Sequence, residues 1–367
     1  MISANRKTTS VIGFCRPVRT LASLTGTSSG SVTEESETWR IWSAAMVVPR
    51  VGVLESFVII RIRESYDNFR VTGRYPPIFD NVVFMRLHVG CAMWTHARWQ
   101  GRLLPAGLPP GERLRAYATW CDAVEGNTTF YATPSRSTVE SWAGQTGPGF
   151  RFVVKLPKAI THERRLTGAE EDLRTFLEAM EPLGSRIHAL WLQLPGSFSP
   201  AGLGALATFL RRLPRSRRYA VEVRHRAFFE DERSQRLLER LLAGFDAEWV
   251  PFDTTVLFQS PPTSDAERDA WTKKPRVPRR MGALTAHPIV RYLGRDDEAR
   301  TIDGWGPWAG TVADWLREGR SPTVFIHTPD NADAPALARR FHDDVRARVP
   351  ELEPLPVPMP SEPLTLF

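Results

Sequence analysis

The sequence predicts an α/β fold of the (β/α)₈ TIM-barrel type, and three observations support that prediction. Short apolar segments with strand character alternate about eight times with segments whose apolar residues recur at helical spacing. This alternation covers about 260 residues, a length typical of such a barrel. Polar residues gather where the strand segments end. A doubly wound open sheet is the alternative, but no GxGxxG follows the first strand and no Walker loop occurs.

Eight segments have the composition of buried strands. Each is short, rich in branched or aromatic residues, and bounded by turn-forming or charged residues. In chain order they are 86–92, a run that begins at 123, and then 150–156, 188–194, 219–224, 247–252, 289–294 and 323–327.

Helical spacing separates these strands. The apolar residues Leu114, Tyr117, Ala118 and Cys121 lie on one helix face, and similar stripes occur in 173–180, 203–210, 237–242 and 308–316. Ser137 and Glu140 have capping-box spacing for a helix through 142, and Asp333 is placed to cap a last helix. Residues 254–287 interrupt the alternation as a long polar insertion.

The two ends of the chain do not share the pattern. Residues 1–84 lack sustained periodicity, and we expect them to be a disordered extension or to precede the true initiator, Met85. Their Arg-, Ser- and Thr-rich beginning only weakly resembles a transit peptide. The barrel domain is expected at 85–349 and an irregular Pro-rich tail at 350–367.

Composition permits an anionic ligand without requiring one. The formal net charge is +7, of which +3 lies in residues 1–84, so a nucleic-acid partner is only weakly supported. Three scattered cysteines, without CxxC spacing, favour a reducing cytoplasm. No apolar run is long enough to span a membrane.

Barrel enzymes place their sites at the carboxyl ends of the strands, and most of the predicted strands here end in polar residues. Their convergence favours a shared pocket over separate helix caps or ion pairs. The catalytic candidates are Glu125, Glu222, Lys155 and Asp253. The binding candidates are Asn127, His162, Gln193, Arg224, His225, Arg291, His327 and Asn331.

Glu125 and Glu222 are the best acid–base candidates, since a carboxylate pair can divide these roles when its environments separate the two pKa values. Alternatively, Arg224 or Lys155 neutralises each carboxylate and the pairs only hold the barrel mouth. Lys155 is a candidate for Schiff-base formation, anion binding or pairing with Glu125.

Cofactors are not specified by the sequence. It carries no nucleotide-cofactor signature. A divalent metal bound by Glu125, Glu222, Asp253 and a histidine is geometrically allowed, but without HxxxH or HxH spacing no residue is assigned as a ligand. The basic run 273–280 overhangs the predicted mouth, either as a solvated loop or as a phosphate clamp.

Six motifs resemble the YecE-like family, known as the domain of unknown function 72, over about residues 86–345. They are VGCAMW (89–94), VEGNTTFY (124–131), FRFVVKLPKAITH (150–162), LWLQLPGSF (190–198), AVEVRH (220–225) and HTPDN (327–331). The resemblance implies a TIM-type barrel and no known reaction. The chain lacks the His that the family often has in the seventh strand, where Leu293 stands, and His327 is a candidate substitute.

Two functional hypotheses follow. The first is an enzyme, hydrolase or isomerase, that acts on a small anionic or polyhydroxylated substrate. The second is a non-catalytic protein that binds nucleic acid or a phosphorylated ligand.

Overall fold

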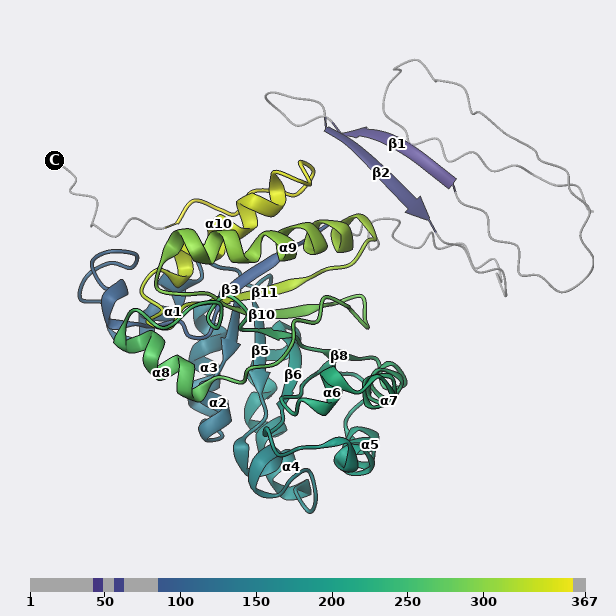
Figure 1. The fold of residues 1–367 in the computed structure, drawn as a ribbon. Coiled ribbons are helices and arrows are strands. Elements are labelled where there is room, and N and C mark those ends of the chain that lie inside the picture. Colours follow the sequence, from purple (N-terminus) through teal and green to yellow (C-terminus); the bar gives the residue numbers. More distant parts are fainter. Residues whose placement is uncertain (1–41, 49–55, 63–84, 359–367) are drawn as a thin grey trace, which may run out of the picture. The chain divides into compact units, whose positions relative to one another are not determined.

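The computed structural model describes residues 85–358, together with the backbone of 42–48 and 56–62 (Figure 1). The chain divides into two compact units, Met1–Val82 and Val83–Phe367. In the first, β1 (Trp42–Val48) and β2 (Ser56–Ile62) form an antiparallel pair. A disordered extension or an upstream stretch was expected here. Of residues 1–84, the structure describes only these two strands, and the rest of that prediction lies outside the described residues.

The second unit is an α/β fold around a parallel sheet of nine strands. The strand order is β8-β7-β6-β5-β4-β3-β11-β10-β9. Each predicted strand segment contains an observed strand, and the sixth is divided in two. The strands are β3 (His88–Cys91), β4 (Ala123–Gly126), β5 (Arg151–Lys155), β6 (Ile187–Gln193), β7 (Tyr219–Glu222), β8 (Ala247–Trp249), β9 (Phe252–Asp253), β10 (Ile289–Leu293) and β11 (Thr323–His327).

The two edge strands, β8 and β9, are consecutive in the chain and are separated only by Val250 and Pro251. Val250 N donates to Val221 O of β7 (2.9 Å), while Pro251 O accepts from Arg291 N of β10 (3.0 Å). Proline has no N–H to donate, which explains why the sixth strand is interrupted at this point. The sheet therefore curls until its two edges meet at one short segment.

Helices cover the outside of this sheet, and α10 packs on β3, β11 and α9 (Figure 1). The α-helices are α1 (Arg113–Tyr117), α2 (Thr128–Tyr131), α3 (Arg136–Gln145), α4 (Glu170–Met180), α5 (Leu203–Arg212), α6 (Ala227–Glu230), α7 (Glu232–Ala243), α8 (Asp265–Lys273), α9 (Glu298–Arg317) and α10 (Ala334–Arg346). Short 3₁₀ or π turns are η1 (Ala97–Trp99), η2 (Pro110–Glu112), η3 (Ala159–Glu163), η4 (Glu181–Arg186) and η5 (Pro200–Gly202).

Of the two predicted helix caps, one lies at a different residue and the other has the predicted N-cap position without the side-chain hydrogen bond. The α3 helix begins two residues earlier than expected, and Ser135, not Ser137, accepts a hydrogen bond from Thr138 N. The Asp333 side chain does not cap α10 and instead pairs with Arg102 Nη1 at 2.7 Å.

One helix is longer than the sequence predicts, and another lies where no helix was predicted. The α9 helix starts ten residues before the expected 308, and its interior contains Pro307, which discourages a helix prediction. The α8 helix lies inside the insertion 254–287, where only polar chain was expected, and Ser264 caps it by accepting from Glu267 N.

The two faces of the sheet carry different side chains. Residues facing the helices belong to the large apolar core. A separate buried cluster consists of residues from successive strands that lie on the other, inner face: Ala123, Val153, Ala189, Trp191, Ala220, Val250, Ile289 and Phe325. Because strand side chains alternate between faces, residues two positions further along each strand point to the same inner side.

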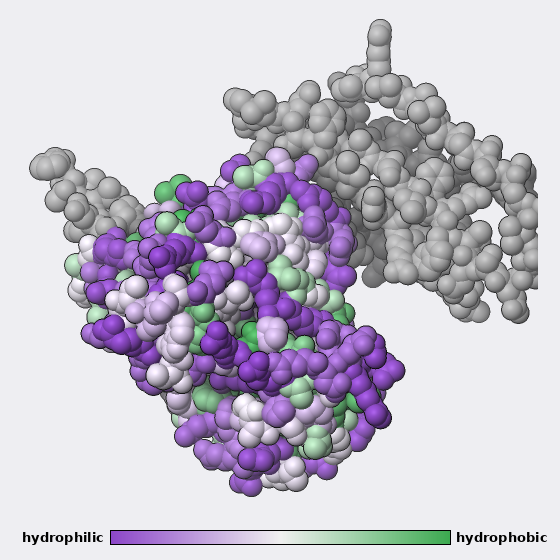
Figure 2. Space-filling view, in the orientation of Figure 1, coloured by the Kyte–Doolittle hydropathy of each residue, from purple (hydrophilic) through white to green (hydrophobic). Residues whose placement is uncertain are grey.

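The surface is mostly polar. Figure 2 shows hydrophilic residues over most of the visible face, with hydrophobic ones in small groups. Among the residues described, the large exposed apolar side chains are Tyr131, Leu237 and Val357. Nor does any helix in 85–358 combine the length and apolarity that crossing a bilayer requires.

Candidate functional site

A buried ion cluster lies at the carboxyl ends of the strands, on the inner face of the sheet. Six of its polar residues follow an inner-face residue by two positions: Glu125, Lys155, Gln193, Glu222, Arg291 and His327. All six are at most 6% exposed. The strand period of two therefore brings together side chains that lie up to 202 positions apart in the chain.

Glu125 is the centre of this cluster. Its Oε1 lies 2.6 Å from Lys155 Nζ, and its Oε2 lies 3.0 Å from Arg291 Nε and 2.9 Å from His327 Nε2. The strand that carries Glu125 is fixed by Tyr117, whose hydroxyl donates to Ala123 O and accepts from Cys91 N, both at 2.8 Å. This carboxylate is thus held by three different strands.

Lys155 is enclosed by oxygen acceptors. Besides its ion pair with Glu125, its ammonium donates to Asn127 Oδ1 (2.6 Å) and Gln193 Oε1 (2.9 Å). Burial and the nearby Arg291 charge lower the pKa of Lys155 to about 7, against the opposing effect of Glu125 and Glu222. Near neutral pH this amine can therefore both give up and accept a proton.

Glu222 forms the second half of the cluster. Its Oε1 accepts from Arg224 Nε at 2.6 Å, whereas its Oε2 lies 3.8 Å from Arg291 Nη1 and has no hydrogen-bond partner among the described residues. Arg291 lies over the ring of Phe252, at 4.2 Å from the ring centroid. Arg291 thus bridges the two carboxylates, and one buried carboxylate oxygen stays free to accept a hydrogen bond.

Both carboxylates are ionised at neutral pH. Burial alone would raise the pKa of Glu125, but Arg291, Lys155 and His327 outweigh it and hold that pKa well below its usual range. For Glu222 burial again acts upward, and Arg224, Arg291 and Lys155 lower the pKa. The expected division of acid and base roles needs separated pKa values, and here both values shift in the same direction.

His327 is neutral at the same pH. Burial, assisted by Arg291, lowers its pKa to about 4, although Glu125 acts in the opposite direction. A neutral imidazole beside an ionised carboxylate donates its N–H, so His327 Nε2 donates to Glu125.

Two further residues lie near the cluster. His162, a predicted binding residue, is half-buried; its Nδ1 lies 2.9 Å from the Thr161 hydroxyl, and burial and Arg224 lower its pKa. Lys274, which the sequence analysis did not single out, is also half-buried, and the carbonyl of the next residue, Pro275, accepts from Thr254 Oγ1 just beyond β9. Lys274 is the second residue of the basic run 273–280, and nothing in that run distinguishes it from its charged neighbours.

Burial and Arg291 lower the pKa of Lys274 to about 8, and Glu125 and Glu222 act upward on it, so Lys274 lies within electrostatic range of the cluster. Among the residues of 85–358, it has no ion-pair partner. The one sequence feature that could have drawn attention to Lys274 is its position before Pro275, in the loop that returns past the carboxyl ends of the strands.

Three predicted residues lie apart from the cluster. Asp253 accepts from Trp308 Nε1 (2.7 Å) and pairs with Arg279 Nε (2.7 Å), because it is one position off the inner-face register. His225 accepts from the backbone of Ala227. Asn331 has a positive φ of 53° and offers its carbonyl to Trp99, as expected of a turn residue.

A metal does not fit this set of donors. The oxygens of Glu125 face Lys155, Arg291 and His327, and Asp253 points elsewhere. Within the described part of the chain, no group of three or more His, Cys, Asp or Glu is arranged to hold a metal ion. The site therefore differs from the carboxylate–histidine set that the sequence allowed.

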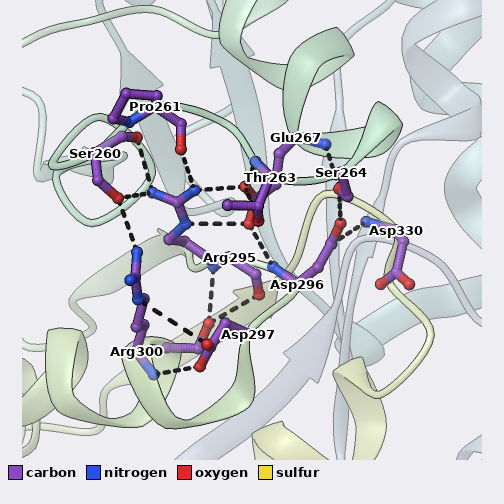
Figure 3. Close-up of polar contacts among 11 residues, drawn as sticks. Ser260, Pro261, Thr263, Ser264, Glu267, Arg295, Asp296, Asp297, Arg300 and Asp330 are labelled. Carbon is purple, nitrogen blue, oxygen red and sulfur yellow. Dashed lines mark hydrogen bonds and ion pairs between the residues drawn. The ribbon is translucent and has the colours of Figure 1, made fainter.

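A second buried ion pair fixes the loops around the mouth (Figure 3). Arg295, directly after β10, binds both oxygens of Glu267 on α8 (3.1 and 2.5 Å) and the carbonyls of Ser260 and Pro261 (2.9 and 2.8 Å). The next residue, Asp296, accepts from Asp330 N at 3.0 Å. The segments that follow β9, β10 and β11 are thereby joined.

Comparisons with known proteins identify the relatives of this chain. A family model described as "Protein of unknown function DUF72" matches residues 88–362. The UPF0759 protein YecE of Escherichia coli is 36% identical over 270 residues, which cover 74% of this chain and 96% of that protein.

Solved structures agree with this assignment at the level of the fold. A DUF72 family protein from Thermotoga maritima has a TM-score of 0.54 at 22% identity and covers 70% of this chain and 98% of its own. One from Enterococcus faecalis has a TM-score of 0.53 at 17% identity, with 71% and 95% covered. The family model and the sequence identity together show that the chain belongs to the DUF72 family.

Proposed function

We propose that this protein is an enzyme that transfers a proton to or from a small anionic or polyhydroxylated substrate at the carboxyl ends of the strands. One arrangement carries the proposal: the Lys155 ammonium is buried between Glu125, Asn127 and Gln193, where burial and Arg291 lower its pKa to about 7. Proton-transfer groups work best when their pKa lies near the working pH. A purely structural ion pair has no need of this property.

The proposal assigns distinct roles. Lys155 is the proton-transfer group, Glu125 pairs with it and opposes the lowering of its pKa, and His327 positions Glu125. Glu222 offers its unpaired Oε2 to a substrate hydroxyl or N–H. The mechanism thus departs from a two-carboxylate acid–base pair, because both carboxylates stay ionised. Hydrolysis and isomerisation are both compatible with a single proton-transfer lysine.

Charge at the mouth supports an anionic substrate. Arg224 is 20% exposed, so its guanidinium reaches the open side of the cluster. Lys274 adds a second cation. Unlike Arg224, which pairs with Glu222, it has no carboxylate partner among the described residues. With Arg291, three permanent or nearly permanent cations face two carboxylates, and Lys155 adds part of a charge. A substrate anion would balance the excess.

The fold supports the location of the site. We propose that the sheet is a closed (β/α)₈ barrel whose sixth strand is divided into β8 and β9, since that strand pairs with β7 on one side and β10 on the other. In such barrels the active site lies at the carboxyl ends of the strands. The cytoplasmic location expected from the cysteines stays a prediction.

Nucleic-acid binding is the weaker alternative. The basic run 273–280 is its main support, yet several of its cations have partners. Lys273 pairs with Asp269 (2.5 Å), Arg279 with Asp253, and Arg280 with Glu239 (3.1 Å). Paired cations contribute less to counterion release on a phosphate backbone. Binding of DNA or RNA with a steep salt dependence would favour this alternative.

The proposal is tested by metabolite turnover with matched variants. Wild type, Lys155→Met and Lys273→Met would each be incubated with a panel of sugars, sugar phosphates and organic acids, and the mixtures followed by chromatography coupled to mass spectrometry, which separates isomers as well as hydrolysis products. We expect one compound to be consumed by wild type and Lys273→Met but not by Lys155→Met. The Lys273 variant controls for loss of a lysine charge at an exposed position of the same protein.

Circular dichroism would establish that each variant is folded. Equal turnover by a folded Lys155→Met variant would remove the lysine from the chemistry. If the wild type consumed no compound of these classes, the proposed substrate chemistry would be wrong. Glu125→Gln and Glu222→Gln variants that lose stability without any loss of turnover would identify the carboxylates as structural.

A further inference from the structure

Three aromatic rings lie in a row beside the ion cluster, in the segments that follow β4 and β5. They belong to Tyr131, Phe130 and His162. The centroid of the Phe130 ring lies 5.4 Å from that of Tyr131 and 5.0 Å from that of His162, and both contacts are edge to face. The proton-transfer function proposed above gives none of these rings a role.

The first two rings are attached firmly to the strand that carries Lys155. They end the short helix α2, which begins directly after Asn127, and Asn127 Oδ1 accepts from Lys155 Nζ at 2.6 Å. Within α2 the Thr129 hydroxyl lies 2.7 Å from the carbonyl oxygens of both Gly126 and Lys155. Hydrogen bonds therefore fix the position of α2 next to the ion cluster.

A strained turn holds the third ring. His162 lies in η3, a single π-helical turn, and such turns are frequent at functional sites. Just beyond it, Arg165 and Leu166 have positive φ angles of 50° and 67°, a left-handed conformation that is costly for residues other than glycine. Leu166 N donates to Ile160 O (2.9 Å) and joins the strained residues to the turn. Strain of this kind persists where it positions functional groups.

The charges of the ion cluster reach His162. Burial and Arg224 lower the pKa of His162, and Glu222 acts upward on it, so this ring lies within electrostatic range of the cluster. Its Nδ1 contacts the Thr161 hydroxyl, whereas its Nε2 has no hydrogen-bond partner among the described residues. The half-buried imidazole therefore has one nitrogen available for a hydrogen bond to a ligand.

Tyr131 is the outer end of the row and is 71% exposed. Among the described residues, it is the one Phe, Trp or Tyr side chain that is mostly exposed. A ligand with an apolar face gains free energy by covering such a ring. At the inner end of the row, the Arg224 side chain is 20% exposed and attracts an anion. The row therefore suits a ligand that is apolar on one face and negatively charged at one end.

We propose that this row binds the ring of a sugar whose anionic group lies at Arg224. The C–H bonds on one face of the sugar pack on the Tyr131 ring, and a hydroxyl at its edge hydrogen-bonds to His162 Nε2. A sugar ring combines an apolar face with hydroxyl groups at its edge, which matches aromatic rings that end at a free imidazole nitrogen. The inference rests on the proposed function and narrows its substrate class to sugar phosphates and sugar acids.

Calorimetry on the full-length protein tests this assignment. The probes are three sugar phosphates (glucose 6-phosphate, fructose 6-phosphate and ribose 5-phosphate) and two sugar acids (glucuronate and galacturonate). Inorganic phosphate and phenyl phosphate serve as references without a sugar ring. We expect at least one sugar probe to bind more tightly than both references, and the set to which it belongs identifies the anionic group.

Variants of the exposed ring locate the binding. Tyr131→Ser should weaken binding of that sugar probe roughly five- to tenfold, the effect of uncovering about 50 Å² of apolar surface, and leave binding of inorganic phosphate unchanged. Tyr131→Phe keeps the ring and should keep the affinity. Leu237→Ser alters another exposed apolar side chain, on α7, and is the matched control. His162→Ala should weaken binding of the sugar probe roughly fivefold, the effect of one hydrogen bond.

Three results would overturn the inference. They are equal affinity of Tyr131→Ser and the wild type for the sugar probe, tighter binding of phenyl phosphate than of every sugar probe, and no sugar probe that binds more tightly than inorganic phosphate. Failure of the proposed function gives a different result. A sugar that binds through Tyr131 without being turned over contradicts proton transfer alone, whereas turnover with a KM that Tyr131→Ser leaves unchanged contradicts the sugar-binding row alone.

Discussion

Replacing Lys155 with methionine should change how stability depends on pH. Methionine keeps a chain of similar length and has no titrating group. The folded-state pKa of Lys155 is about 7, against roughly 10.4 in an unfolded chain. Between these values the unfolded state binds more protons than the folded state. The free energy of unfolding of the wild type therefore rises with pH across this window, and this contribution is absent below about pH 7.

The magnitude follows from the difference between the two pKa values. Each pH unit of difference corresponds to about 1.4 kcal/mol, so the whole window amounts to about 4–5 kcal/mol. Lys155 is 2% exposed, and solvent screening therefore removes little of it. Between pH 7 and 9.5, below the range where tyrosines ionise, the wild type should gain about 3 kcal/mol relative to Lys155→Met.

Urea unfolding of the full-length protein at pH 6, 7, 8, 9 and 9.5 measures this difference. The comparison uses the change with pH and not the absolute stability, because removing Lys155 also leaves Glu125 with one partner fewer. A Lys273→Met variant reports the effect of losing an exposed lysine. Wild-type and Lys155→Met curves that run parallel from pH 6 to 9.5 would refute the lowered pKa and the proton-transfer role built on it.

Three other predictions test parts of the fold. Glu267→Gln leaves Arg295 as an unpaired buried charge and should reduce the free energy of unfolding by about 3–5 kcal/mol in urea titrations; a loss under 1 kcal/mol would contradict the clamp. Trp308→Phe removes the N–H that donates a hydrogen bond to Asp253 and should lower the free energy of unfolding by about 1–3 kcal/mol, again measured by urea titration. Burial lowers the pKa of His342 to about 4, below its unfolded value of about 6.5, so its stabilising contribution is lost as pH falls from 6.5 to 4. His342→Leu should therefore flatten the dependence of Tm on pH between 4 and 6.5. A variant with the same pH dependence as the wild type would contradict the lowered pKa.

Much of the site was predictable because strands alternate with a period of two. Glu125, Lys155, Glu222, Arg291 and His327 were each identified as polar residues at strand ends, and the structure brings all five into contact. The same rule would have excluded one candidate. Asp253 is an odd number of positions from the inner-face residue Val250, and it faces Trp308 of α9.

The protonation pattern was not predictable. The sequence suggested that Glu125 and Glu222 divide acid and base roles, yet Arg291 contacts both and lowers both pKa values. Which cation contacts which carboxylate depends on the register between strands far apart in the chain. For example, Arg291 lies beside Phe252 of β9 and Phe325 of β11. Such pairings are fixed by the order and register of the strands in the sheet and leave no local pattern.

The basic run 273–280 shows the same limit most clearly, and it also shows why net charge is a weak guide to partners. Four of its cations point to four different surroundings. Lys273 pairs with Asp269 on the surface, Lys274 lies within electrostatic range of the ion cluster, Arg279 neutralises Asp253, and Arg280 lies over the ring of Trp249. Lys273 ends α8 and 274–280 is a loop, so the charges of this run take different directions and are divided between the surface and the interior. What reads as one phosphate clamp in the sequence is therefore a set of separate contacts with different partners.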